Sequence, residues 1–219
     1  MTEFTQTAKN RVRRVPNRGT YDKATIYPIV DAALICHVGL VQDGEPVVIP
    51  TLHARRGDEI LLHGATTSRL IQVAAAGHPL CLTMTLVDGL VLARSVFHHS
   101  VNYRSAVLFG RGQLVPDAQK LEYLAYFTEK LLPGRWDDVR PPNAAEAKAT
   151  AVVAVTIESA SAKVRTGPPK DDEEDYALPV WAGVLPIQQT FGKLATDPQL
   201  AEGIGVPEYL QAYINASYP

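Results

Sequence analysis

The feature that most constrains the fold is a series of short runs rich in Val, Ile and Leu, separated by tight turns. Three connections carry Asp43-Gly44, Arg56-Gly57 and Asp88-Gly89, and an Asp-Gly pair between apolar runs is a strong hairpin signal. Antiparallel strands at this spacing predict a mainly β (α+β) fold, a closed six- to seven-stranded antiparallel barrel with peripheral helices. The expected strands are 33–40, 46–55, 59–64, 80–86, 90–97, 105–115 and 150–159.

Helices are expected at four places in the chain. Asp22, Ser68 and Asp117 each precede apolar residues at helical spacing, as a capping residue does. A last short helix is predicted near Pro207–Ile214. The sequence therefore indicates one domain over residues 1–219, in which 160–219 form a C-terminal extension.

The bulk composition is that of an ordinary globular protein. The chain is 46% hydrophobic and 20% charged with a formal net charge of −2. This composition has no excess of Lys and Arg that would indicate a nucleic-acid-binding face. Cys36 and Cys81, far apart and flanked by apolar residues, are expected to be reduced core thiols. Residues 1–16 lack an apolar leader segment, and the longest apolar stretch, 151–155, is too short to span a bilayer. We expect a cytoplasmic protein without a membrane partner.

One stretch has the composition of a phosphate-binding turn. His63-Gly64 ends a predicted strand, and three hydroxyl residues then precede Arg69 at a helix start. Backbone N–H groups at a helix start favour an anion, and a guanidinium adds charge and a two-pronged donor. The alternative is that Thr66, Thr67 and Ser68 only cap the helix. A single site of this kind, without a Gly-x-Gly-x-x-Gly unit, favours FMN over FAD.

Other polar segments are weaker candidates. The segment 100–105 is expected as a polar loop at a barrel rim. His98 and His99 are adjacent, so in a strand they would point to opposite faces, and no metal site is predicted. The basic arm before Tyr21 and the acidic run 171–175 are both expected to be solvated. No hydrolase elbow or nucleotide triphosphatase loop is present.

The order of these elements resembles a known family. The chain is similar to the flavin-nucleotide-binding branch of the pyridoxamine 5'-phosphate oxidase-like FMN-binding split barrels, a branch that includes nitroimidazole-resistance proteins. The likeness covers roughly residues 10–190. It is carried by 43–51, 57–64, 88–94, 102–105, 165–169 and 181–184.

The resemblance implies a homodimer with FMN at the subunit interface. It implies that one strand lines the flavin, that the turn before the second helix holds the phosphate, and that a third segment completes the pocket. These cofactor-binding residues would be Pro50, Thr51 and Leu52, then His63, Gly64, Ser68 and Arg69, then Tyr103, Arg104 and Ser105. The Arg-x-His ending of true pyridoxamine-phosphate oxidases is absent, and related proteins bind haem or deazaflavin instead of FMN.

The segment 166–185 is predicted to pack at or near the cofactor site, in its own subunit or in the partner. It combines Gly167-Pro168-Pro169 with Trp181 and has no regular period, so packing must hold it. The alternative is that Trp181 fills the end of the barrel core.

Two functions stay open at this point. The first is an FMN oxidoreductase that passes electrons from a nicotinamide cofactor to a small organic acceptor. The second is a non-catalytic flavin or haem binding or storage protein.

Overall fold

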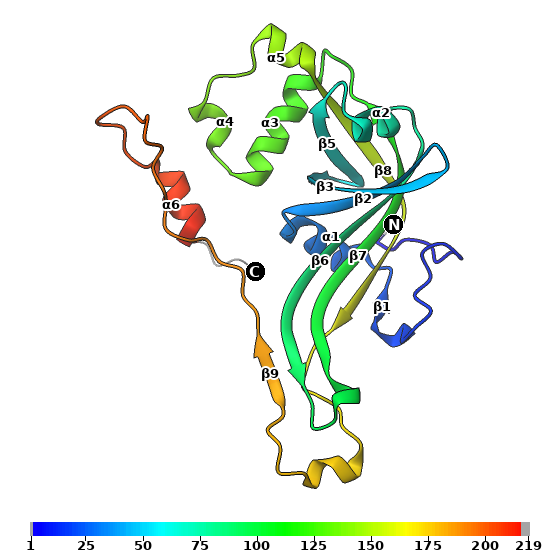
Figure 1. The fold of residues 1–219 in the computed structure, drawn as a ribbon. Coiled ribbons are helices and arrows are strands. Elements are labelled where there is room, and N and C mark those ends of the chain that lie inside the picture. The colour runs from blue at the N-terminus through cyan, green and yellow to red at the C-terminus, as the bar shows by residue number, and fades with distance from the viewer. Residues whose placement is uncertain (1, 216–219) are drawn as a thin grey trace.

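The computed structural model describes residues 2–215, and its centre is a nine-stranded antiparallel sheet curved around an apolar core (Figure 1). The strands follow one another in the order β3-β2-β6-β7-β8-β5-β4, while β1 pairs with β8 and β9 pairs with β6. The strand bounds are β1 Gly19–Thr20, β2 Ile35–Gln42, β3 Glu45–Leu52, β4 Ala54–Arg56, β5 Glu59–Ala65, β6 Pro79–Leu92, β7 Ser100–Leu114, β8 Thr150–Arg165 and β9 Gly183–Pro186.

Short helices cover the sheet and connect its strands. The α-helices are α1 Lys23–Ala32, α2 Arg69–Ala75, α3 Lys120–Leu131, α4 Arg135–Asp138, α5 Ala144–Ala149 and α6 Glu208–Asn215. The 3₁₀ helices are η1 Pro16–Arg18, η2 Val96–His98 and η3 Glu173–Ala177. Asp22 caps α1 as expected, with its side chain accepting a hydrogen bond from the Ala24 N–H.

Two apolar clusters lie on opposite faces of the sheet. The larger one joins α1 and α2 to the inner faces of the strands, and includes the fully buried Ile26, Leu82 and Leu108. The smaller one packs α3 through Phe127 against Leu61 and the start of β8. Because strand residues alternate between faces, Leu62 joins the first cluster and Leu61 the second.

The predicted mainly β class, split barrel and helical covers are confirmed, and the sheet does not close into the full barrel that the strand pattern alone suggested. Within residues 2–215 no ladder joins β3 to β4, which end the path of paired strands. The Asp43-Gly44 turn is the predicted two-residue hairpin, with φ of 52° and 81° at its two residues.

The prediction of a hairpin at Asp88-Gly89 was wrong. β6 continues through both residues with a bulge between Val87 and Gly89, and the chain reverses later, through η2. A Cβ on Gly89 would lie 2.9 Å from the Leu185 carbonyl oxygen, so the glycine allows β9 to approach β6. Residues 100–105 consequently belong to β7 and are not the expected loop.

Neither the N-terminal arm nor the acidic run 171–175 is simply solvated. In the N-terminal arm, Phe4 joins the larger core, and the buried Asn10 donates a 3.0 Å hydrogen bond to the Ala160 carbonyl on β8. In the acidic run, the Asp171 side chain is fully buried and pairs with Arg94 at 3.0 Å. The arm therefore packs against the larger core and β8, and the acidic run is anchored to the end of β6.

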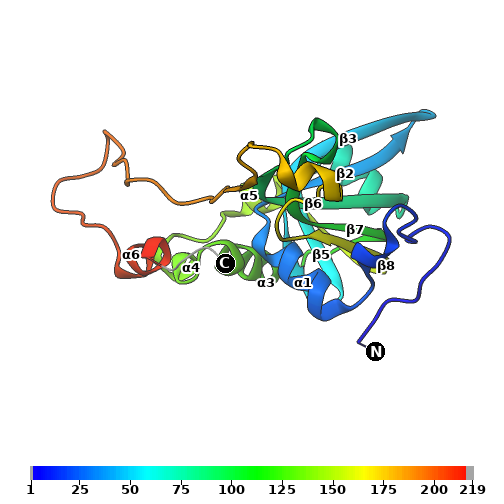
Figure 2. The ribbon, with the colours of Figure 1, turned by 90° about the horizontal axis from the view of Figure 1, so that it is seen from below.

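After β9, the C-terminal chain runs away from the sheet as an extended arm and ends in α6 beside α4 (Figures 1 and 2). The Tyr209 hydroxyl donates to Asp138 at 2.6 Å and accepts from Arg135 at 3.0 Å, which fixes α6 there. Exposed apolar side chains line this arm, including Ile187, Phe191, Leu194, Leu200, Ile204 and Val206. No helix among the described residues is long and apolar enough to cross a membrane.

Candidate functional site

The predicted phosphate-binding turn connects β5 to α2. Ser68 occupies the N-cap position, but its side chain makes no capping hydrogen bond. Arg69 is exposed, and its guanidinium has no hydrogen bond or ion pair among the described residues. The alternative in which the hydroxyls serve only to cap the helix therefore receives no support from the side-chain contacts, and the Arg69 fork is available to a ligand.

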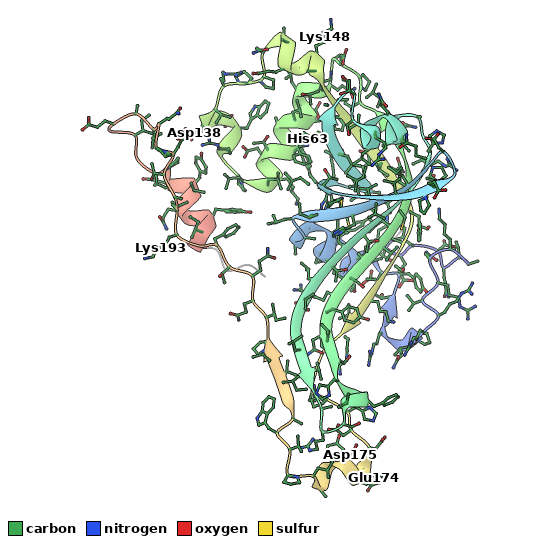
Figure 3. All side chains as sticks on the ribbon, in the orientation of Figure 1. His63, Asp138, Lys148, Glu174, Asp175 and Lys193 are labelled. Atoms are coloured by element: carbon green, nitrogen blue, oxygen red, sulfur yellow. The ribbon has the colours of Figure 1, made fainter. Side chains whose placement is uncertain are left out.

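His63 and Gly64, although adjacent, face different elements. The His63 ring packs edge-on against Phe127 of α3 at a centroid distance of 4.4 Å, and Figure 3 shows it between β5 and α3. A Cβ on Gly64 would meet the Ile71 side chain of α2 at 3.2 Å. Burial lowers the pKa of His63, and its Nδ1 is buried without a partner. Strand alternation thus separates the His63 ring from the α2 turn.

A groove of about 550 Å³ adjoins the same turn, between α2, α3 and α5. Thr66 and Gln72 line it beside the exposed side chains of Leu114 and Leu121. Lys120 also lines the groove and is held by the Ala147 carbonyl at 2.9 Å and by Asp117 at 2.7 Å. Sequence analysis missed this lysine, because its spacing in an amphipathic helix gives no sign of burial.

The predicted flavin-lining residues are at the end of β3, an edge strand. Pro50 and Leu52 are exposed, and Thr51 is half-buried. Pro50 lies opposite His37 of β2, and its lack of an N–H is tolerated at a sheet edge. This end of β3 has the exposed, partly apolar surface that a flat ring requires.

The third predicted group splits between two faces of β7. Tyr103 lies opposite Arg165 of β8, and Ser105 lies opposite Lys163, so these pairs share a face. Arg104 points the other way and forms a two-pronged ion pair with Asp88, through Nε to Oδ2 at 3.0 Å and Nη2 to Oδ1 at 2.8 Å. The guanidinium of Arg104 is thus already engaged by a carboxylate at the β6 bulge.

Within one protomer, the predicted phosphate-binding turn (63–69) and the predicted pocket residues 103–105 lie at opposite ends of β8. Gly64 pairs with Ala151 and Tyr103 pairs with Arg165, fourteen residues further along the strand. At 3.3 Å per residue this is about 45 Å measured along β8. Figure 3 shows Lys148, just before β8, at one end of the molecule and Glu174, which follows β8 in η3, at the other. The structure does not bring the two groups together in one chain.

The end of the sheet at the β6–β7 connection, called the far tip here, holds a cluster of polar and apolar residues that was not predicted. The Arg94 backbone N–H and guanidinium both donate to Asp171, and a Ser95 N–H adds a 3.4 Å bond. Burial acts to raise the pKa of Asp171, but these hydrogen bonds outweigh it and the pKa is lowered. Val96 and Phe97 project from the tip with 89% and 88% of their surface exposed.

Trp181 lies near this tip and does not fill the barrel core. It is 69% exposed, and its ring covers Gly183, where an added Cβ would lie 2.8 Å from the ring atoms. The core-filling alternative for Trp181 was therefore wrong. Its predicted proximity to a cofactor remains a prediction.

The fold is that of a split barrel, and comparison with known proteins identifies the family. Residues 22–164 match the model of the pyridoxamine 5'-phosphate oxidase family, and the chain belongs to that family. No curated protein sequence matches the chain.

Two solved structures are similar over nearly the whole chain. The flavocytochrome Anf3 from Azotobacter vinelandii is 42% identical, with a TM-score of 0.89, covering 94% of this chain and 96% of that one. The FAD and haem binding protein from Mycobacterium smegmatis is 35% identical, with a TM-score of 0.86, covering 89% and 96%. A protein assigned to 5-nitroimidazole resistance in Bacteroides thetaiotaomicron, 21% identical with a TM-score of 0.57, covers 67% and 86% and shares the fold.

Proposed function

We propose that this protein binds both a flavin and a haem and transfers electrons between them. The observation that carries the proposal is the 42% identity over 94% of the chain to a flavocytochrome. The FAD and haem binding relative supports the same pair of cofactors. A flavin accepts hydride or single electrons and a haem iron exchanges single electrons, so the chemistry belongs to the cofactors.

Arg69 fits the phosphate end of the flavin. Its guanidinium is exposed and unpaired in the described residues, close to the half-buried Ser68 hydroxyl at the helix start. The exposed end of β3, with Pro50 and Leu52, offers an apolar surface for the ring. FMN was favoured from the sequence, whereas the name of one relative specifies FAD. We propose FAD for this chain, on the strength of that relative, with FMN as the alternative.

His99 is the residue that would bind the haem iron. Its Nδ1 lies 2.8 Å from the Ser95 carbonyl oxygen, which can only accept, so Nδ1 carries the proton. Nε2 then presents its lone pair, and histidine ligands are commonly oriented by such a carbonyl contact. The neighbouring Val96 and Phe97, both almost fully exposed, provide apolar surface for a porphyrin.

We propose a nicotinamide cofactor as electron donor and a small organic molecule as acceptor, with a binding or storage role as the alternative. The residues act by holding the cofactors and by excluding water, because no described residue is required as a proton donor for flavin chemistry. Anaerobic mixing with NADH or NADPH separates the two roles, since a storage protein leaves the flavin oxidised.

We also propose that the protein acts as a homodimer in the cytoplasm. The C-terminal arm exposes a row of large apolar side chains that its own barrel does not cover, among them Ile187, Ile204 and Val206. A symmetric partner covers such surface in the simplest way.

The absorption spectrum of the freshly purified protein tests the proposal. The spectrum is expected to show both flavin bands and a haem Soret band. Mass spectrometry of the released flavin then distinguishes FAD from FMN. A colourless protein that takes up neither added haemin nor added flavin would refute the proposed function.

A further inference from the structure

Arg165, at the end of β8, is a buried arginine without an acidic partner. Only 7% of its surface is exposed. Its Nη1 donates to the Asn102 side chain, while its Nε is buried without a partner among residues 2–215. A buried charge is strongly unfavourable unless it is paired, so an arginine in this state calls for an anion.

The surroundings add positive charge and no negative charge. Gly19 pairs with Lys163 in the β1–β8 ladder, which brings Arg18 next to this end of β8. None of the ion pairs among residues 2–215 includes Arg18, Lys163 or Arg165. Burial, and then the charge of Arg18, lower the pKa of Arg165.

No acid at this end of the sheet is paired with Arg165 among the described residues, and Glu173, Glu174 and Asp175 of η3 form no ion pair with it. Asp88 is paired with Arg104 through two hydrogen bonds, and Asp171 is paired with Arg94. The polar neighbours of Arg165 are neutral: Asn102, whose amide donates 3.1 Å to the Gly167 carbonyl, and Tyr103, directly opposite in β7. The described residues therefore supply donors around Arg165 but no acid paired with it.

We infer that Arg165 and Arg18 form a binding site for the anionic oxygens of a bound cofactor, either haem propionates or flavin phosphates. Guanidinium forks bind carboxylate and phosphate in the same two-pronged manner. Ser100 begins β7 only three residues before Tyr103, about 10 Å along the strand, so the site is near His99. The identity of the ligand rests on the proposed function, whereas the existence of an anion site does not.

The test measures how fast each cofactor leaves the purified protein. Haem loss is followed by transfer to excess apomyoglobin, and flavin loss by the fluorescence of the released flavin after dilution. Arg165→Met and Arg18→Met are each expected to speed the release of one cofactor at least tenfold and to leave the other within twofold. Faster haem release identifies propionates as the ligand, and faster flavin release identifies phosphates.

Arg111→Met is the matched control, because Arg111 is an exposed arginine on the same pair of strands with its own partner, Glu158, at 3.6 Å. Arg18→Met keeps the test valid if Arg165→Met does not fold. Release rates within twofold of the parent in the folded variants would overturn the inference, and accompanying dimer dissociation would point to an acid from the second copy.

If the purified protein carries no cofactor, the proposed function fails but the site is still tested. Titration calorimetry with pyrophosphate then replaces the release assay. Binding that disappears in Arg165→Met and persists in Arg111→Met supports the anion site, and the absence of binding to the parent protein overturns it.

Discussion

Arg69→Ala is expected to weaken flavin binding about thirtyfold while leaving the fold intact. The guanidinium is exposed and makes no ion pair among the described residues, so its removal breaks no contact within the protein. A hydrogen bond to a charged group contributes about 1.5–3 kcal/mol. Exposure to solvent reduces that value, and a net loss of about 2 kcal/mol corresponds to roughly thirtyfold in the dissociation constant.

The assay is a titration of the flavin-free protein with FAD and with FMN, followed by the change in flavin fluorescence. Arg69→Lys should recover part of the affinity, because a lysine keeps the charge but loses the fork. Arg111→Ala is the control, since Arg111 is also exposed but contacts the Gly77 carbonyl just after the C-terminal end of α2, opposite to the end that carries Arg69.

If Arg69→Ala binds flavin as tightly as the parent, the phosphate lies elsewhere. Arg104 is then a less suitable alternative than the sequence suggested, because Asp88 already engages two of its donor nitrogens. A weakened Arg69→Ala with a lowered melting temperature would also refute the reasoning, since the structure gives Arg69 no part in folding.

The remaining predictions concern assembly, the tail, the sheet and the haem. Light scattering should return twice the 23.8 kDa chain mass, and a monomer at micromolar concentration would contradict the proposed dimer. Flavin should quench tryptophan fluorescence, and Trp181→Phe should remove most of that change, whereas a loss seen only in Trp136→Phe would place the tail away from the flavin. Gly110→Ala should cost about 3 kcal/mol, or roughly 10 °C in melting temperature, because its Cβ would lie 2.0 Å from the Thr156 carbonyl oxygen; Gly192→Ala, which meets no atom within 4 Å, should be neutral. His99→Ala should lower haem occupancy at least tenfold in the absorption spectrum, with unchanged occupancy excluding it as the ligand.

Local sequence signals predicted the parts of the fold that local chemistry decides. Asp43-Gly44 forms a hairpin because both residues adopt positive φ, which Asp tolerates and Gly favours. The dipeptide Asp88-Gly89 carries the same signal but lies in a bulge, because a strand almost one hundred residues later pairs there. A short-range signal cannot reveal which of these two outcomes a long-range pairing selects.

The candidate sites likewise combine features that local sequence decides with features that arise from contacts between distant segments. The helix start at Ser68 and Arg69 could be predicted because it is a local feature of the sequence, whereas the phosphate-binding role of these residues stays a prediction. Arg165 could not be identified as an anion site, because its burial and the one side-chain hydrogen bond it makes among the described residues, to Asn102, arise from segments 63 residues apart. The family resemblance assigned His63 to the phosphate end of the flavin, and strand alternation turns its ring towards α3.

The distance between the two sites bears on how the protein works. The α2 turn and the Arg165 site are about 45 Å apart along β8, so one protomer cannot hold a single cofactor between them. Electron transfer within one chain would have to cross the apolar core of the barrel. A second copy that places its β6–β7 tip against the α2 turn of the first would bring the flavin and haem residues into one site. The exposed Val96, Phe97 and Trp181 at that tip are the surface that such a contact would bury. On this argument dimer formation is a condition for electron transfer, and a variant that dissociates the dimer should retain separate cofactor binding but lose flavin-to-haem reduction.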